Sequence, residues 1–243
     1  LNLSNGAYLD YVTASSGLML MGTVLISSVV SIETLNNQGT IYNRNDTDCT
    51  LIVSVRLNNF GTIASNPSGN NLNLELQGDI YNYHTITPAY LTLGSEYATH
   101  DIYQTSGTPL ISAPTITAMG DYRMVSNLTI SNSNVSWNSH VLIMHNGSGG
   151  FILHLNGATM AGVQIESLPG STLDLSNNAW VGGITAGDLC FNGIVQIGDG
   201  VEIDRLLNLG TLRNRGDFPH TLVVRQRLEN QGSILNATSG NWL

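Results

Sequence analysis

The sequence predicts an all-β fold, a β-solenoid with a parallel β-helix-like stack of coils of roughly 17 to 22 residues each. The first reason is a phrase of the form Leu-Asn-Asn-x-Gly-Thr-Ile, which occurs at residues 35–41 and 57–63 and returns in looser copies. The second is spacing, because within each half of the chain the phrase glycines return at nearly fixed intervals: Gly22, Gly39, Gly61, Gly78, then Gly193, Gly210, Gly232. Such repetition is typical of a chain that stacks on itself.

Short strands between these glycines supply the interior of each coil. In the segment 72–76, Leu alternates with Asn and Glu, so one face of the strand is apolar. Asn and Gly favour positive φ, and the phrase glycines are therefore expected to be the turns between strands. A single coil cannot bury its apolar edge, so several must stack, and a chain of this length predicts about 12 coils.

The periodicity divides the chain into three parts of one continuous structural domain. Residues 1–82 read as regular coils. Residues 83–126 lack the Gly-Thr-Ile phrase and contain Pro88, Pro109 and Pro114 together with five tyrosines, which predicts an irregular excursion. Regular coils resume over residues 127–243.

The composition favours a folded protein with unguarded strand edges. Charged residues make up 10% of the chain against a usual ~25%. There are 27 Asn and no Lys. Lys is a common guard on exposed strand edges, where it discourages pairing with another chain. Its absence favours association between copies.

Charge and hydropathy exclude two classes of partner. A net charge of −9 and a pI near 4.8 argue against nucleic acid, which needs a basic surface. No apolar run approaches the ~20 residues of a membrane helix, so membrane insertion is not expected.

An extracellular location, at the cell surface or in the cell envelope, is the expectation from the N-terminus and the sequons. The chain opens at Leu1 without an initiator Met, which suits a processed, exported protein or a trimmed one. Six Asn-x-Ser/Thr sequons are candidate glycosylation sites: Asn2, Asn45, Asn127, Asn134, Asn146 and Asn236.

The two cysteines, Cys49 and Cys190, are expected to lie too far apart for an internal disulfide. In a single straight solenoid six or seven coils separate them, on the order of 30 Å, whereas bridged Cα atoms lie within ~7 Å. Two alternatives remain. They are buried thiols, or they form intermolecular disulfides between subunits, which the polar run before Cys49 favours.

Catalytic and metal motifs are not apparent, so the sequence predicts neither an enzyme nor a cofactor. Asp46 with Asp48, and Asp199 with Glu202 and Asp204, are the only candidates for calcium, and turn chemistry is favoured over ligation there. The six histidines have no metal-ligand spacing. Nothing resembles a nucleophile elbow, and a chain without Lys cannot carry the basic motif of solenoid polysaccharide hydrolases.

The Leu-Asn-Asn-x-Gly-Thr-Ile phrases resemble those of right-handed β-helical surface proteins, including filamentous haemagglutinin-like adhesins. With the lysine-free composition, coils that continue to both ends and two distant cysteines, the chain also resembles the amyloid-like cell-sheath proteins of methanogenic archaea. That resemblance implies subunits stacked into hoops or tubes, associated laterally and linked covalently.

The leading hypothesis is therefore an extracellular structural protein that self-assembles by β-stacking and lateral association into a sheath, tube or surface-layer-like polymer. Its partners are copies of itself. The alternative is a β-helical adhesin or appendage module whose aromatic region, within residues 83–126, binds a surface glycan or receptor. A polysaccharide-active enzyme is the least favoured reading.

Overall fold

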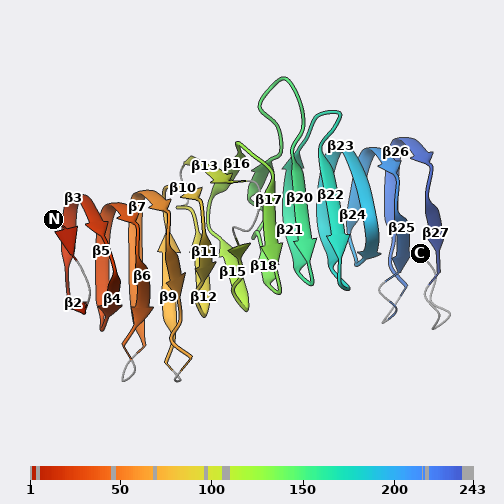
Figure 1. Ribbon diagram of the computed structural model, residues 1–243. Coiled ribbons are helices and arrows are strands. Elements are labelled where there is room, and N and C mark those ends of the chain that lie inside the picture. The colour runs from red at the N-terminus through yellow and green to blue at the C-terminus, as the bar shows by residue number, and fades with distance from the viewer. Residues whose placement is uncertain are drawn as a thin grey trace. The chain divides into compact units, whose positions relative to one another are not determined.

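The computed structural model confirms the predicted fold class, because its parallel strands stack as a β-solenoid of about 10 turns (Figure 1). The structure describes residues 2–3, 6–44, 48–67, 70–95, 98–105, 110–214, 216 and 219–236. These residues form strands and connecting turns, and no helix. The number of turns is smaller than the sequence predicts because some coils are longer than the phrase spacing. Leu128, for example, pairs in register with Leu153 of the next coil.

The strands divide between two compact units, Leu1–Gly120 and Asp121–Leu243, called unit 1 and unit 2. Unit 1 contains β1 (Asn2–Leu3), β2 (Ala7–Leu9), β3 (Thr13–Leu20), β4 (Thr23–Ile26), β5 (Val29–Asn37), β6 (Thr40–Asn43), β7 (Cys49–Asn59), β8 (Thr62–Ala64), β9 (Leu72–Leu76), β10 (Asp79–Asn82), β11 (Thr85–Thr87), β12 (Tyr90–Leu93), β13 (Thr99–Gln104), β14 (Leu110–Ile111) and β15 (Thr115–Ala118).

Unit 2 contains β16 (Asp121–Met124), β17 (Leu128–Ser131), β18 (Asn134–Ser136), β19 (Val141–Ile143), β20 (Ile152–Asn156), β21 (Thr159–Glu166), β22 (Thr172–Ser176), β23 (Trp180–Ile197), β24 (Val201–Asn208), β25 (Thr211–Asn214), β26 (Leu222–Asn230) and β27 (Ser233–Leu235). Two loops project from this unit on the same side in Figure 1, one joining β19 to β20 and the other joining β21 to β22.

The core of unit 1 consists of columns of aliphatic side chains, one from each coil. Because strands of successive coils pair in parallel register, residues of one type stack directly on one another. One such column is fully buried and runs through five coils: Val24, Ile41, Ile63, Ile86 and Ile111. β-branched side chains suit this position because they pack well on a pleated surface.

Unit 2 is built in the same way with more varied side chains. Its buried column from β19 to β24 is Leu142, Ile165, Ala186 and Ile203. The coil length also varies, since the register step from Leu142 to Ile165 spans more of the chain than the step from Ala186 to Ile203. The corners absorb most of these differences, and a register shift between Ile203 and Arg205 occurs where β24 pairs with β26.

Six of the seven phrase glycines lie between strands, where the sequence predicts turns, and Gly193 lies within β23. Only Gly22 and Gly193 have positive φ, at 70° and 73°. The other five are required by close approach between coils, because an added Cβ would meet the backbone of the preceding coil. At Gly61 that Cβ would lie 1.9 Å from the carbonyl oxygen of Gly39, and at Gly232 it would lie 1.9 Å from that of Gly210. Positive φ is supplied instead by other residues, including Asn132, Asn138, Asn177 and Asn178.

The described part of residues 83–126 is not an excursion, and that prediction needs correction. β12 pairs in parallel with β9 on one side and β15 on the other, with Leu91 between Leu74 and Ile116. The Gly-Thr-Ile phrase is absent here, yet the alternation of Thr and Tyr with Leu and Ile keeps the same faces inward. Pro88 and Pro114 stand between strands, where no ladder hydrogen bond is needed from them.

The described residues include no helix that is long and apolar enough to cross a membrane.

Candidate functional site

A ladder of buried asparagines runs along one corner of unit 1. The Asn37 amide Nδ2 donates to Asn59 Oδ1 at 2.8 Å, and Asn59 Nδ2 donates to Asn82 Oδ1 at 2.9 Å. Each of the three side chains is fully buried. The ladder ends at Asn82, whose Nδ2 has no hydrogen-bond partner among the described residues. Asn208 and Asn230 repeat one step of the ladder in unit 2, at 2.6 Å.

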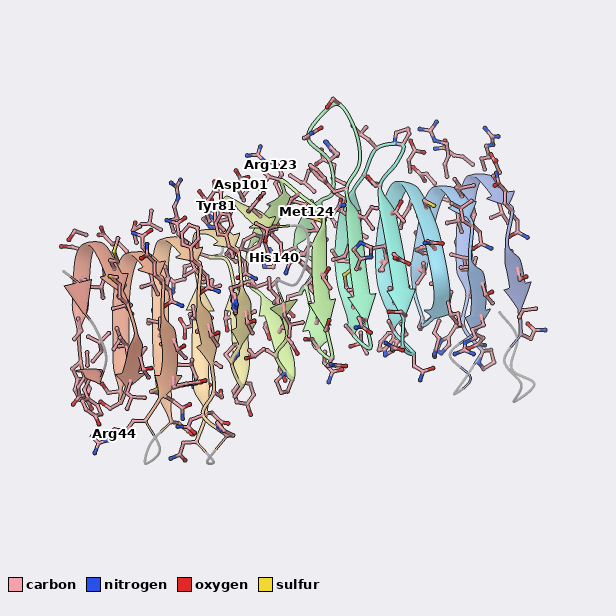
Figure 2. The ribbon with its side chains drawn as sticks, viewed as in Figure 1. Arg44, Tyr81, Asp101, Arg123, Met124 and His140 are labelled. Carbon is pink, nitrogen blue, oxygen red and sulfur yellow. The ribbon has the colours of Figure 1, made fainter. Side chains whose placement is uncertain are left out.

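Aromatic rings stack on the outer side of the same corner. The rings of Phe60 and Tyr83 lie 4.4 Å apart and are parallel within 9°, and Tyr103 follows at 5.4 Å from Tyr83. Tyr81 lies 6.1 Å from Tyr103 and is covered by the Arg56 guanidinium at 5.2 Å. Phe60 and Tyr83 turn their faces to one another, an arrangement that stabilises the stack and leaves less ring face for a glycan. Tyr81 and Asp101, on the neighbouring strands β10 and β13, are labelled in Figure 2.

Outward polar residues of unit 2 pair across neighbouring coils. His154 Nδ1 lies 2.9 Å from Asp174 Oδ2, and His145 Nε2 lies 3.1 Å from Glu166 Oε1. Arg205 Nη2 donates to Asp188 Oδ2 at 2.7 Å, and Arg225 forms an ion pair with Glu202. Arg227 pairs with Glu229 of its own strand at 2.9 Å.

Three hollows open on the surface of unit 2. The first, of about 260 Å³, lies beside Cys190, Asp188 and Arg205. The second, of about 450 Å³, is lined by polar, small and aliphatic residues: Val141, Gln164, Ile165, Glu166, Thr185, Ala186, Gly187, Glu202, Asp204 and Arg225. The third, of about 430 Å³, adjoins it at Glu166 and reaches the loop between β19 and β20: Arg123, Val125, Ile143, His145, Asn146 and Gly147. Figure 2 shows Arg123 projecting outward from β16.

The loop between β19 and β20 is held in shape by its own side chains. His145 and Gly150 form an antiparallel bridge at its base. Asn146 Oδ1 accepts hydrogen bonds from the backbone amides of Ser148 at 3.0 Å and Gly149 at 3.2 Å. This loop, which forms one wall of the third hollow, is therefore held in a defined conformation by its own hydrogen bonds.

Both cysteines are buried free thiols, at 3% exposure for Cys49 and 7% for Cys190. Cys49 faces the interior of unit 1, where burial first and the Asp48 charge second raise its pKa from 9.0 to about 11. Burial also raises the pKa of Cys190 in unit 2. A thiol of raised pKa and low exposure is a poor nucleophile for disulfide formation. Of the two alternatives from sequence, the structure favours buried thiols over intermolecular disulfides.

The other sequence-based candidates separate into exposed positions and positions outside the described residues. Asn127, Asn134, Asn146 and Asn236 are exposed and remain candidate glycosylation sites. Asn45 lies outside the described residues, as does the side chain of Asn2. Asp46 of the first calcium candidate also lies outside them, and no cluster able to hold a metal ion occurs in the described part of the chain.

The last described coil, formed by β26 and β27, exposes side chains that are buried one coil earlier. Leu228 is 46% exposed, while its register partner Leu206 is 2% exposed. Ile234 is 41% exposed, while its partner Leu212 is fully buried. Among the described strands, β26 pairs with β24 and β27 pairs with β25.

Sequence reasoning missed the hollows of unit 2. The sequence suggested turn chemistry, or less favourably calcium ligation, for Glu202 and Asp204, and Gly187 did not stand out in it. The one signal in the sequence was Gly187 itself, a glycine that lies outside the repeated phrase. Such a glycine leaves a gap in an outward column, but the register is needed to show which side chains lie on either side of it.

No protein-family model, curated protein or solved structure matches the chain.

Proposed function

We propose that this chain is an extracellular structural protein that associates with copies of itself by β-stacking on its last described coil. The product of such association is a sheath, tube or surface-layer-like polymer. The single observation that carries the proposal is that the described coils are joined by one repeated pattern, parallel register pairing over buried aliphatic columns, which a second copy can extend.

The exposed coil has the same inward pattern as the coil that it covers. Leu228 and Ile234 continue the columns of Leu206 and Leu212. Burying a side chain of this size stabilises by roughly 1.5 to 3 kcal/mol, so covering the coil is favourable. Pairing with a strand of a second copy adds backbone hydrogen bonds of the same parallel type that join the described coils.

A second copy of the chain is the occupant that we propose. The described coils consist of parallel strands with aliphatic inner faces, and strands of this kind can pair with β26 and β27 and cover their inner side chains. The sequence contains no Lys, so the usual guard against such pairing is missing.

Analytical ultracentrifugation and electron microscopy of residues 1–243 over a hundredfold concentration range test the proposal. We expect assembly that grows with concentration and that is lost in the double variant Leu228→Lys and Ile234→Lys, because two charges then occupy the inner face of the edge. Val223→Lys is the matched control, since Val223 lies on the same strand, is already 38% exposed and belongs to the outward row that contains Glu202. A wild-type chain that stays monomeric throughout, or a double variant that assembles normally, contradicts the proposal.

A further inference from the structure

One outward column of unit 2 has a gap at Gly187. By the register of β21, β23 and β24, this column contains Glu166, Gly187 and Asp204, one residue from each of three successive coils. The two carboxylate-bearing residues are therefore two coil spacings apart, about 10 Å between Cα atoms. Since Gly187 has no side chain, nothing fills the space between them, and all three residues line the second hollow.

Polar groups with different hydrogen-bonding capacity surround this gap. Gln164 and Thr185 form the neighbouring outward column with Glu202. Asp204 has no ion pair or hydrogen bond within the described part of the chain. The Ser167 hydroxyl, which also lacks a partner among the described residues, lies 3.8 Å from where a Cβ of Gly187 would be. The Asp204 carboxylate therefore borders the hollow, while the Ser167 hydroxyl lies buried beneath Gly187.

Two of the three carboxylates around the gap are already paired inside the protein. Glu166 lies beside His145, and Glu202 forms an ion pair with Arg225. An anionic ligand would meet the unpaired Asp204 carboxylate, and a ligand with several cationic groups would have to break the two existing pairs. A neutral hydroxyl can bond to a paired carboxylate or guanidinium without displacing its partner. The third hollow continues from Glu166 to the ordered loop at His145 and Asn146, so the polar surface extends beyond one sugar ring.

We propose that these two adjoining hollows form a groove that binds a neutral oligosaccharide, with one sugar ring over Gly187 between Glu166 and Asp204. The site is separate from the inner side chains of the proposed self-association surface, because Arg225 is its one residue on β26 and pairs with the outward Glu202. Asp204 accepts hydrogen bonds from the ring hydroxyls, and the Gln164 amide donates hydrogen bonds to them. Arg225 closes one end of the gap.

Isothermal titration of the full chain with cellohexaose, mannohexaose and chitohexaose tests the groove, with hexalysine as the charged probe. We expect at least one neutral hexasaccharide to bind. The Gly187→Leu variant should lose binding by about tenfold or more, because the new side chain fills the gap. Gly187 does not have positive φ and its added Cβ has only ordinary contacts, so this variant is expected to fold.

A second variant, Asp204→Asn, and a control, Asp174→Asn, test the role of the carboxylate in the groove. Asp204→Asn preserves the shape of the groove and removes the free carboxylate, so it should weaken binding by roughly tenfold. Asp174→Asn is the matched control, an outward carboxylate of the same unit that lines neither hollow, and it should bind as the wild type does. The proposal is overturned if no neutral hexasaccharide binds, if only hexalysine binds, or if Gly187→Leu binds undiminished.

Discussion

Unit 1 and unit 2 share one backbone plan and differ in what each column contains. Columns of unit 1 repeat one side-chain type, as in Ile41 on Ile63 or Asn37 on Asn59. Outward columns of unit 2 change type from coil to coil, as in Glu166, Gly187 and Asp204. Like residues in register stabilise one another, whereas unlike residues leave gaps and polar groups at the surface. From this comparison we expect substitutions in the buried columns of unit 1 to lower stability more than substitutions in the outward columns of unit 2.

The largest expected effect separates a glycine of unit 1 from one of unit 2. Gly61→Ala places a Cβ 1.9 Å from the Gly39 carbonyl oxygen, so we expect a loss of about 3 kcal/mol or more in the free energy of unfolding. Gly187→Ala has contacts of 3.8 Å and should change stability by less than about 0.5 kcal/mol. Urea denaturation measures both. Equal effects of the two substitutions would break the comparison.

The asparagine ladder provides the next test. Asn59→Leu removes the acceptor for Asn37 and the donor to Asn82 inside the core, and we expect a loss of roughly 2 to 3 kcal/mol. Asn58→Leu is the control, because the Asn58 amide bonds to Asn36 on the half-buried side and its loss should be below about 1 kcal/mol. Thermal and urea unfolding of the two variants should rank them in that order. A smaller loss for Asn59 than for Asn58 would contradict the role of the ladder.

The stability of unit 1 is expected to depend on pH through the buried thiol of Cys49. The pKa of Cys49 is raised from 9.0 to about 11, so the unfolded chain releases this proton first as the pH rises. Stability from this group is complete below pH 9.0 and declines by up to about 2 kcal/mol as the pH approaches 11. Unfolding free energies between these pH values, compared with Cys49→Ala, measure it. A variant with the same alkaline loss as the wild type would show that Cys49 is not its source.

The smallest expected effect concerns two surface pairs, Phe60 with Tyr83 in unit 1 and His154 with Asp174 in unit 2. Phe60→Leu removes the parallel ring pair with Tyr83 and should lower stability by about 1 kcal/mol, because stacked aromatic rings contribute beyond their buried area. In unit 2, His154→Gln replaces half of an exposed pair with Asp174, and its effect should stay below about 0.5 kcal/mol. Thermal unfolding followed by circular dichroism compares the two. If the histidine variant is the less stable, unit 2 also depends on its surface pairs.

The fold was predictable from sequence because the residues of the repeated phrase are the same residues that stabilise the stack of coils. The Leu and Ile of each phrase are the buried columns, and the phrase glycines mark where coils approach most closely. The same phrase gives a wrong prediction over residues 83–126. Strands such as β12 and β15 keep the inward alternation of Leu and Ile without any phrase glycine, so the coils continue where the motif stops.

The candidate site was predictable only in fragments. Glu202 and Asp204 are close in sequence and stand out there, but Glu166 and Gly187 join them through the register of three coils. Register depends on coil length, which is short in the step from Ala186 to Ile203 and longer elsewhere in unit 2. A single sequence does not reveal these lengths where the phrase is absent. The burial of Cys190 was hidden for the same reason, since it depends on what neighbouring coils place over it.

The varying coil length has a consequence for how such a chain changes over generations. Asn37 and Asn59 occupy equivalent places in successive coils. Recombination that joins Asn37 directly to Phe60 deletes one whole coil, and the reverse event duplicates it. Either product keeps every remaining inner column continuous, because each coil contacts only its neighbours. Genes for chains of this kind can therefore lengthen and shorten in whole steps, and the size of the protein is free to drift while its architecture is conserved.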